Sequence, residues 1–295
     1  MLAMRVAFVG LGTMGYPMAG HLLASGFEVC VYNRSADKSE RWLAEHPRGE
    51  IANTPREAAM NADVVLSCVG NDDDVRSVYY GDDGIFADLN RGAICVDHTT
   101  ASASLAKELA AAAKQLDCGF LDGPVSGGEA GAINGVLTVM MGGEQVHFDK
   151  VEPVLKAFSK AVTLVGEHGA GQVCKMANQL CIAGVLQGLS EGLKLAQSAG
   201  LDIETVQAVL KHGAAGSWQL ENRALTMAKG EFDFGFAIDW MRKDLSICFE
   251  QAVQLNVELP LAKQVDQRYA QLQERGFSRS DTSVLIKQFD QDQHA

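Results

Sequence analysis

The amino-acid sequence predicts an α/β domain with a doubly wound, mostly parallel sheet, followed by an all-α domain. Short β-rich runs alternate with helix-like stretches up to about Val165, a pattern typical of parallel sheets with crossover helices. The strand signal stops after Gly166, and the rest reads as successive helices. A length of 295 residues suits two domains better than one core. We therefore expect domains over residues 1–165 and 166–295.

The strands are expected at short runs of β-branched, aromatic and other apolar residues, which are Val6–Val9, Phe27–Tyr32, Asp63–Val69, Ala93–Asp97, Phe120–Leu121, Val136–Met141 and Ala161–Val165. Ser102–Leu116, with its alanine-rich face, is typical of the helices between them. Glycine and Pro260 separate the later helices, which we expect at Ile203–Lys211, Trp218–Ala228, Phe236–Leu255, Leu261–Arg275 and Thr282–Phe289.

One long, largely apolar helix is expected from Gly169 to Ala199, a stretch without proline. Because it is apolar around most of its circumference, we expect burial on several sides. It would lie either between the two domains or against a second subunit, which favours a homodimer or homotetramer.

The first strand leads directly into a glycine-rich turn. Gly10, Gly12 and Gly15 follow it in the order G-x-G-x-x-G, and Pro17 suits the first turn of a helix. The first glycine makes the turn, the second admits a pyrophosphate, and the third lets the helix pack on the strand. The helix N-terminus favours the anion. An ordinary glycine-rich turn is the alternative, but the strand–turn–helix context indicates a Rossmann domain, with cofactor contacts from Gly10, Leu11, Gly12, Thr13, Met14 and Gly15.

The end of the second strand bears on which dinucleotide is bound. An Asp or Glu there bonds the ribose 2′-hydroxyl of NAD, but this chain has Asn33, Arg34 and Ser35. Asn33 carries no charge to repel a 2′-phosphate, and Arg34 can pair with one. The sequence thus favours NADP, with NAD as the alternative if Arg34 is simply a surface residue.

Other strand ends fall on the same edge of the sheet, where ligands bind in doubly wound folds. Val69 and Gly70 follow one strand, and Thr99 and Thr100 follow another. The threonines either contact the nicotinamide end or cap the helix that begins near Ser102. The acidic run 71–74 suits a first helical turn better than a metal site, and His98 is interpreted as a loop histidine.

Composition excludes several classes of partner. The net charge of −12 argues against nucleic acid and anionic membrane surfaces. There is no membrane-length apolar run and no signal-peptide pattern. The seven cysteines lack C-x-x-C spacing, and the seven histidines lack ligand spacing. We expect mostly buried thiols, a cytoplasmic location and no metal site.

Two segments carry candidate chemistry. After a strand, Ser126, Gly127 and Gly128 form a loop whose backbone N–H groups and hydroxyl suit a substrate carboxylate. On the long helix, Lys175, Asn178 and Gln179 share one face at i, i+3 and i+4. Spacing alone leaves two interpretations open for each segment: a flexible loop or a binding loop, and a solvated stripe or a functional one.

Four motifs together resemble the β-hydroxyacid dehydrogenases, the family that includes 3-hydroxyisobutyrate dehydrogenases and the tartronate semialdehyde and glyoxylate/succinic semialdehyde reductases. The motifs, in the family's order, are FVGLGTMGYPMAGHL, DGPVSGG, GEHGAGQVCKMANQ and MRKDL. The resemblance spans nearly the whole chain. It implies a Rossmann domain followed by a helical domain built around a long interdomain helix.

The resemblance also implies roles for individual residues. Lys175 matches the family's catalytic lysine, a general acid in carbonyl reduction and a base in alcohol oxidation. Ser126, Gly127 and Gly128 match the carboxylate-binding loop, Asn178 matches a substrate-binding residue, and Lys243 matches a lysine near the nicotinamide. The implied reaction is hydride transfer between NADP(H) and a small β-hydroxyacid or its semialdehyde or keto acid.

The chain departs from the family pattern at two places. Gln179 replaces a second asparagine, and Val69-Gly70 replaces a common Leu-Pro, which leaves the substrate unnamed. Imine reductases share the architecture but usually lack the lysine, and 6-phosphogluconate dehydrogenases are much longer and carry H-N-G after theirs. A non-catalytic NADP-binding scaffold on this fold is the alternative from another class, although Lys175, Ser126 and Asn178 are all present.

Overall fold

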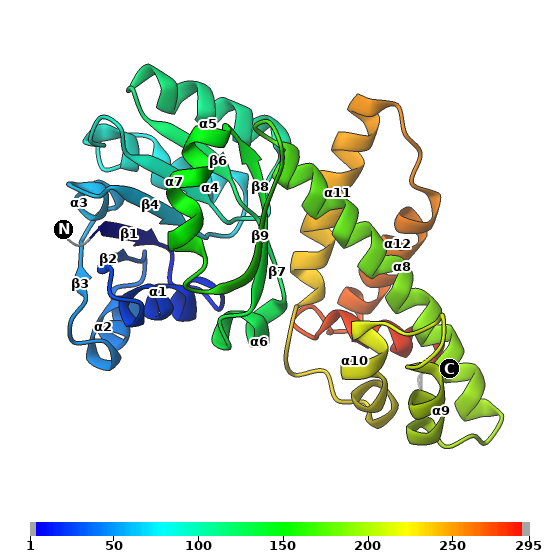
Figure 1. The fold of residues 1–295 in the computed structure, drawn as a ribbon. Coiled ribbons are helices and arrows are strands. Elements are labelled where there is room, and N and C mark those ends of the chain that lie inside the picture. Colours follow the sequence, from blue (N-terminus) through cyan, green and yellow to red (C-terminus); the bar gives the residue numbers. More distant parts are fainter. Residues whose placement is uncertain (1–3, 291–295) are drawn as a thin grey trace. The chain divides into compact units, whose positions relative to one another are not determined.

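The computed structural model describes residues 4–290. Its contacts divide the chain into two compact units, one up to Lys175 and one from Met176 onward. In Figure 1 the first unit is a sheet flanked by helices, coloured blue to green, and the second is made of helices, coloured light green to red. The predicted fold class, a doubly wound α/β unit followed by an all-α unit, is confirmed.

The sheet of the first unit has the strand order β3-β2-β1-β4-β5-β6-β8-β7, with β9 also paired to β8. Strands β1 to β6 pair in parallel, β8 is antiparallel to β6 and β7, and β9 is parallel to β8. The strands are β1 Arg5–Val9, β2 Glu28–Tyr32, β3 Glu50–Ile51, β4 Val64–Ser67, β5 Ile94–Asp97, β6 Gly119–Asp122, β7 Val125–Ser126, β8 Leu137–Gly143 and β9 Ser159–Gly166.

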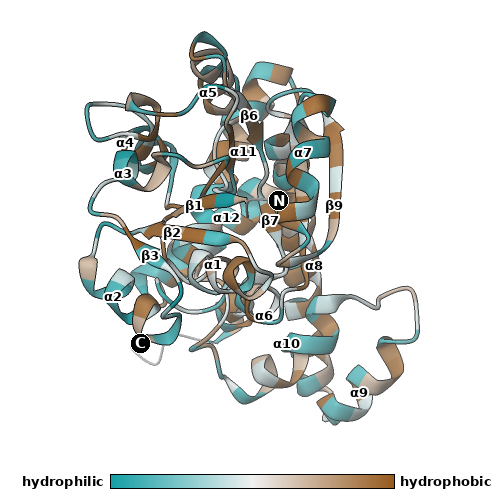
Figure 2. Cartoon of the chain, turned by 60° about the vertical axis from the view of Figure 1, so that its left-hand side comes forward, coloured by the Kyte–Doolittle hydropathy of each residue, from teal (hydrophilic) through white to brown (hydrophobic). Residues whose placement is uncertain are grey.

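Helices cover both faces of this sheet. Because side chains alternate along a strand, Val6 and Phe8 of β1 pack with residues of α1, α2 and α7, whereas Ala7 and Val9 pack with residues of α3, α4 and α5. Both faces of β1 are therefore apolar, and the strand is largely brown in Figure 2. The helices of this unit are α1 Gly15–Ala24, α2 Ala36–Glu45, α3 Pro55–Ala59, α4 Asp72–Tyr79, η1 Ile85–Ala87, α5 Ala103–Gln115, α6 Gly128–Ile133 and α7 Gln145–Leu155.

The long helix α8 spans Ala170–Ser198, close to its predicted limits, and continues from the first unit into the second. Its later turns contribute Ala183, Leu186 and Leu193 to the apolar core of the helical unit. No helix within residues 4–290 is both long and apolar enough to cross a membrane. The remaining elements are α9 Ile203–Leu210, α10 Trp218–Lys229, α11 Ile238–Leu255, α12 Pro260–Glu274 and η2 Thr282–Phe289.

Two short strands and one C-terminal segment show where the structure differs from the sequence expectation. The strands β3 and β7 have two residues each, too few for an alternating pattern to reveal them. The segment Thr282–Phe289 was expected as a helix and is a 3₁₀ helix. Asp281 caps its start, because the Asp281 carboxylate accepts hydrogen bonds from the backbone N–H and hydroxyl of Ser283.

Candidate active site

The glycine-rich turn after β1 is built by close backbone approach. Gly10 has φ +101°, in the region that favours glycine, and its N–H donates to the Tyr32 carbonyl at 2.8 Å. A Cβ on Gly10 would collide with the Cys68 carbonyl, and one on Gly15 would collide with the Gly10 carbonyl. These two glycines are therefore required by the fold of the turn itself.

The middle glycine of the motif has a different surrounding. A Cβ built on Gly12 would meet no atom within 4 Å, so its backbone is open to a ligand. Helix α1 then begins at Gly15, and Met14 before it provides no side-chain cap. An uncapped helix start beside an open glycine is the cradle that a pyrophosphate requires. These residues fit a dinucleotide cofactor.

The three residues after β2 lie beside this turn. The Asn33 Oδ1 atom accepts a hydrogen bond from the Leu11 N–H at 2.9 Å, and its Nδ2 donates to the Ser35 carbonyl at 3.0 Å. Asn33 therefore joins the β2 end to the glycine turn, a contact across 22 residues. The Arg34 side chain is 86% exposed, and its Nη1 lies 3.3 Å from Asp74 Oδ1.

The ends of β4 and β5 are joined by a buried network around Asp97. Its carboxylate accepts hydrogen bonds from the hydroxyls of Ser67 at 2.7 Å and Thr99 at 2.8 Å. The Thr99 hydroxyl in turn accepts the Val69 N–H at 3.0 Å. Burial raises the pKa of Asp97 to about 7, opposed by the hydrogen bonds from Ser67 and Thr99. Thr99 is thus an internal connection between two strand ends.

The helix caps near these strand ends come from other residues than the threonines. Ser102 caps α5 by accepting the Leu105 N–H at 3.1 Å, whereas Thr100 is half-buried and precedes the cap. Asn71 caps α4, and the acidic residues after it form the first turn of that helix, as expected. No cluster of potential metal ligands occurs in the described part of the chain.

His98 is buried behind the strand ends. Its Nδ1 lies 2.6 Å from the Gly123 carbonyl, and because a carbonyl only accepts, Nδ1 is the donor. Burial lowers the pKa of His98 to about 4. The ring is thus neutral at physiological pH and has a structural role in the loop after β5, in keeping with its interpretation as a loop histidine.

The candidate carboxylate loop contains β7 and the start of α6. Ser126 ends β7, which pairs with β8. Gly127 has φ +133° and Gly128 has φ +62°. A Cβ on Gly128 would meet no atom within 4 Å, and no side chain caps the start of α6. The loop thus presents backbone that fits a small anion.

The start of α8 is held by side chains that the sequence interpretation did not single out. The Asp122 carboxylate accepts the N–H groups of Gly169 at 2.7 Å and Gln172 at 2.9 Å. The Gln172 side chain donates to the Thr99 carbonyl at 2.8 Å and accepts the Ala101 N–H at 3.0 Å. Both residues stand inside motifs that the sequence displays, but only their contacts reveal their role.

Lys175 lies three residues after Gln172 on α8 and is only 8% exposed. A buried lysine is uncommon because burial disfavours its charge. Of the two interpretations that spacing left open, the solvated stripe is therefore wrong for Lys175.

A second polar network lies within the helical unit. Gln179 is buried, and its Nε2 donates to Asp244 Oδ2 at 2.7 Å. Asn178 Nδ2 donates to Gln179 Oε1 at 2.8 Å, and Lys243 Nζ lies 2.8 Å from Asp244 Oδ1. The predicted residues Asn178 and Lys243 are therefore joined through Asp244 and through Gln179, the glutamine that departs from the family pattern.

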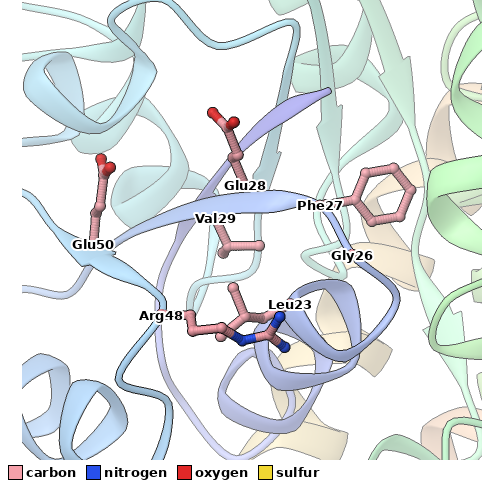
Figure 3. A pocket seen from close by; sticks show the side chains of 7 residues that line it. All are labelled: Leu23, Gly26, Phe27, Glu28, Val29, Arg48 and Glu50. Atoms are coloured by element: carbon pink, nitrogen blue, oxygen red, sulfur yellow. The ribbon is translucent and has the colours of Figure 1, made fainter. Parts of the chain in front are cut away.

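A hollow lies at the amino-terminal ends of the strands, opposite the ends that lead into the predicted cofactor residues. It lies where β2 begins, and Figure 3 shows the Arg48 side chain and the carboxylates of Glu28 and Glu50 around it. Glu50 is engaged with Arg5 at 2.7 Å. The predicted cofactor residues follow the other, carboxyl ends of the strands. The hollow is lined by Leu23, Gly26, Phe27, Glu28, Val29, Arg48 and Glu50.

Comparison with known proteins agrees with this geometry. Residues 5–166 match the NAD binding domain of 6-phosphogluconate dehydrogenase, and residues 169–289 match the NAD-binding domain of NADP-dependent 3-hydroxyisobutyrate dehydrogenase. An uncharacterized oxidoreductase of Shewanella frigidimarina is 55% identical over 96% of this chain and 97% of its own. An NAD-dependent L-serine dehydrogenase of Pseudomonas aeruginosa is 31% identical over 97% and 98%.

A solved structure is similar to this chain over nearly all of its length. The 3-hydroxyisobutyrate dehydrogenase of Mycobacterium tuberculosis, solved with L-serine, has a TM-score of 0.87 at 27% identity and covers 98% of this chain and all of its own. Both family matches together account for nearly all of the described residues. The chain therefore belongs to the β-hydroxyacid dehydrogenase family of oxidoreductases, with an NAD(P)-binding Rossmann domain.

Proposed function

We propose that this protein transfers a hydride between NADP(H) and a small β-hydroxyacid or its semialdehyde or keto acid, with Lys175 as the general acid and base. The observation that carries the proposal is a lysine only 8% exposed near the start of α8, in a chain of this dehydrogenase family. The nicotinamide supplies or receives the hydride when bound, and the protein must move the proton.

Lys175 suits the proton transfer by its chemistry and its setting. Carbonyl reduction creates an alkoxide, and an ammonium group donates a proton to it, whereas alcohol oxidation requires the neutral amine as a base. The interior also strengthens attraction between an ammonium and a developing negative charge. Lys175 therefore both protonates and stabilises the reacting oxygen.

The remaining substrate contacts follow from charge and from the family. The loop of Ser126, Gly127 and Gly128 offers a hydroxyl and an uncapped helix start to the substrate carboxylate. Asn178 holds the substrate and Lys243 lies near the nicotinamide, as family membership implies. A carboxylate fixed at one end leaves the carbonyl at the other end to Lys175, which favours small acids as substrates.

The lysine is tested by turnover. Lys175→Ala should lower kcat on the order of 100-fold or more, the usual scale of general acid catalysis, while NADPH still binds. NADPH oxidation should be followed with glyoxylate, succinic semialdehyde, tartronate semialdehyde, methylmalonate semialdehyde and a cyclic imine. The matched control is Lys194→Ala on the same helix, where Lys194 pairs with Asp290 at 3.1 Å. Unchanged turnover in Lys175→Ala would refute the role.

The same substrate panel separates the alternative functions. Turnover of the imine alone would indicate an imine reductase. Tight NADPH binding with no turnover of any compound would indicate a scaffold.

NADP preference is proposed from Arg34 and Asn33. An exposed ion pair such as Arg34–Asp74 is worth little, so Arg34 is available to pair with a 2′-phosphate, and Asn33 adds no opposing charge. Arg34→Ala should lower kcat/KM for NADPH on the order of tenfold and leave NADH nearly unchanged. Arg91→Ala is the matched control, since Arg91 is equally exposed at 86% and pairs with Asp117. A wild-type preference for NADH would refute the proposal.

A further inference from the structure

The first turn of α8 is attached to the sheet by a buried carboxylate. Asp122 is the last residue of β6 and has no exposed surface. Its two oxygens accept separate N–H groups, Gly169 at Oδ1 and Gln172 at Oδ2. A carboxylate in this position satisfies donors that a helix start leaves unpaired and suits the helix dipole. The strand end and the helix start are thus bonded at two points.

The backbone around this carboxylate leaves it little room to move. A Cβ on Gly142 of β8 would lie 2.5 Å from Asp122 Oδ1, and a Cβ on Gly171 would lie 2.8 Å from Oδ2. Neither glycine has a Cβ, so strand and helix close directly around the carboxylate. His168 adds a hydrogen bond between its Nε2 and the Phe120 carbonyl at 3.0 Å. The contact between β6 and the α8 start is therefore closely defined.

Gln172 extends the attachment to a third segment. It is 1% exposed, and its amide bonds the Thr99 carbonyl and the Ala101 N–H on the loop after β5. Both hydrogen-bonding ends of the amide are used, which fixes the side chain in one orientation. Lys175 stands one helical turn further along the same face. A displacement of Gln172 would therefore be passed on to Lys175.

We propose that Asp122 and Gln172 are positioning residues that hold the first turn of α8 and thereby fix Lys175 relative to the Ser126–Gly128 loop. Asp122 serves both sides, because the chain runs from it through two residues into β7 and that loop. The proposal rests on the function assigned to Lys175. It adds that the proton donor and the carboxylate loop keep their spacing through one buried carboxylate and one buried amide.

A double-mutant cycle tests this proposal. Gln172→Met keeps the length of the side chain and removes both of its amide hydrogen bonds. A misplacement of about 1 Å can cost about 100-fold in rate, so we expect kcat to fall by roughly 30- to 100-fold. NADPH affinity should stay within about twofold, because the cofactor turn is not touched. In a Lys175→Ala background, the same change should lower the residual single-turnover rate by less than about threefold, since the group it positions is absent.

A second readout does not depend on that residual rate. A trifluoromethyl keto acid gives a less basic alkoxide, which needs a proton donor less. The loss caused by Gln172→Met should therefore be clearly smaller with this substrate than with its unfluorinated counterpart. Ser159→Ala is the structural control. Ser159 is buried, and its hydroxyl donates to the Leu155 carbonyl at 2.7 Å, a hydrogen bond that does not involve α8. It should leave kcat unchanged.

The outcomes distinguish the two proposals. An equal loss from Gln172→Met with and without Lys175, equal losses with both substrates, or no loss at all would overturn the positioning role. An unaffected Lys175→Ala enzyme would instead overturn the proposed function. If Gln172→Met does not fold, as judged by circular dichroism and NADPH binding, Asp122→Asn takes its place in the cycle with the same expectations.

Discussion

The helices α1 and α8 both begin within the first unit, at Gly15 and Ala170, after the ends of β1 and β9. The start of α1 has no side-chain cap and follows an open glycine, Gly12. At the start of α8, the N–H groups of Gly169 and Gln172 are taken up by a buried carboxylate. Open donors serve an anionic ligand, whereas paired donors fix the helix in place. We therefore expect the same feature of a helix to serve binding at α1 and positioning at α8.

Thr99 connects the two regions. Its hydroxyl bonds Asp97 and Val69 on the side of the cofactor turn, and its carbonyl accepts from Gln172 on the side of α8. The junction is buried, so its hydrogen bonds are made without competition from water. Changes at the junction and at each helix start should therefore affect different properties of the protein.

The largest effect is expected on the free energy of unfolding when Asp97, at the junction, is replaced, and this effect depends on pH. With a folded-state pKa of about 7 against 3.8 normally, Asp97 contributes stability below about pH 4 that is lost as the pH rises to 7. Asp97→Asn cannot titrate. Relative to wild type, its free energy of unfolding should therefore rise by up to about 4 kcal/mol between pH 4 and 7.

Urea unfolding at several pH values measures this difference. The opposite slope expected from His98, whose pKa is lowered, occurs in both proteins and cancels. Parallel stability curves for Asp97→Asn and wild type would show that ionisation of Asp97 does not destabilise the folded protein.

The next largest effect is on stability, and it tests the packing of the cofactor turn independently of cofactor binding. Gly15→Ala places a Cβ against the Gly10 carbonyl and 2.8 Å from the Phe8 ring. Such overpacking should destabilise the protein by about 3 kcal/mol, measured by urea unfolding without cofactor. A variant as stable as wild type would show that the turn is loose enough to admit a methyl group.

Much of the fold follows from local pattern, because apolar runs and helix periodicity are properties of adjacent residues. The succession of most strands and helices along the chain and the limits of α8 were predicted in this way. The strands β3 and β7 were missed because two residues carry no period. The cofactor turn was predictable for the same reason: its three glycines are close in sequence, and Gly10 and Gly15 lie against backbone that leaves no room for a Cβ.

The positioning network at α8 depends on distant residues. Asp122 and Gln172 are 50 residues apart, and Gln172 and Thr99 are 73 apart. No local pattern distinguishes Asp122 from any other aspartate after a strand. Asn33 shows the same limit, since the sequence indicates its lack of charge but not its hydrogen bond to Leu11. Lys175 was singled out by its shared helix face with Asn178 and Gln179 and by the family motif, but its burial is visible only in the packed structure.

The smallest effect sharpens the contrast within the glycine turn. Gly12→Ala meets no neighbouring atom, so stability should change by less than about 0.5 kcal/mol. The methyl group would instead stand where the pyrophosphate approaches. The Kd for NADPH should rise on the order of tenfold, equal to about 1.4 kcal/mol, by fluorescence titration. An unaltered Kd would show that the phosphates do not pass Gly12.

The contrast between the two helix starts is tested most directly by amide hydrogen exchange, resolved by residue with NMR, with and without NADPH. Without cofactor, the amides of Gly169 and Gln172 should already be protected, whereas those of Gly12, Thr13 and Met14 should exchange fast and become protected when NADPH is added. Rapid exchange at Gly169 and Gln172 in the free protein, or no protection of the glycine turn by NADPH, would contradict the account.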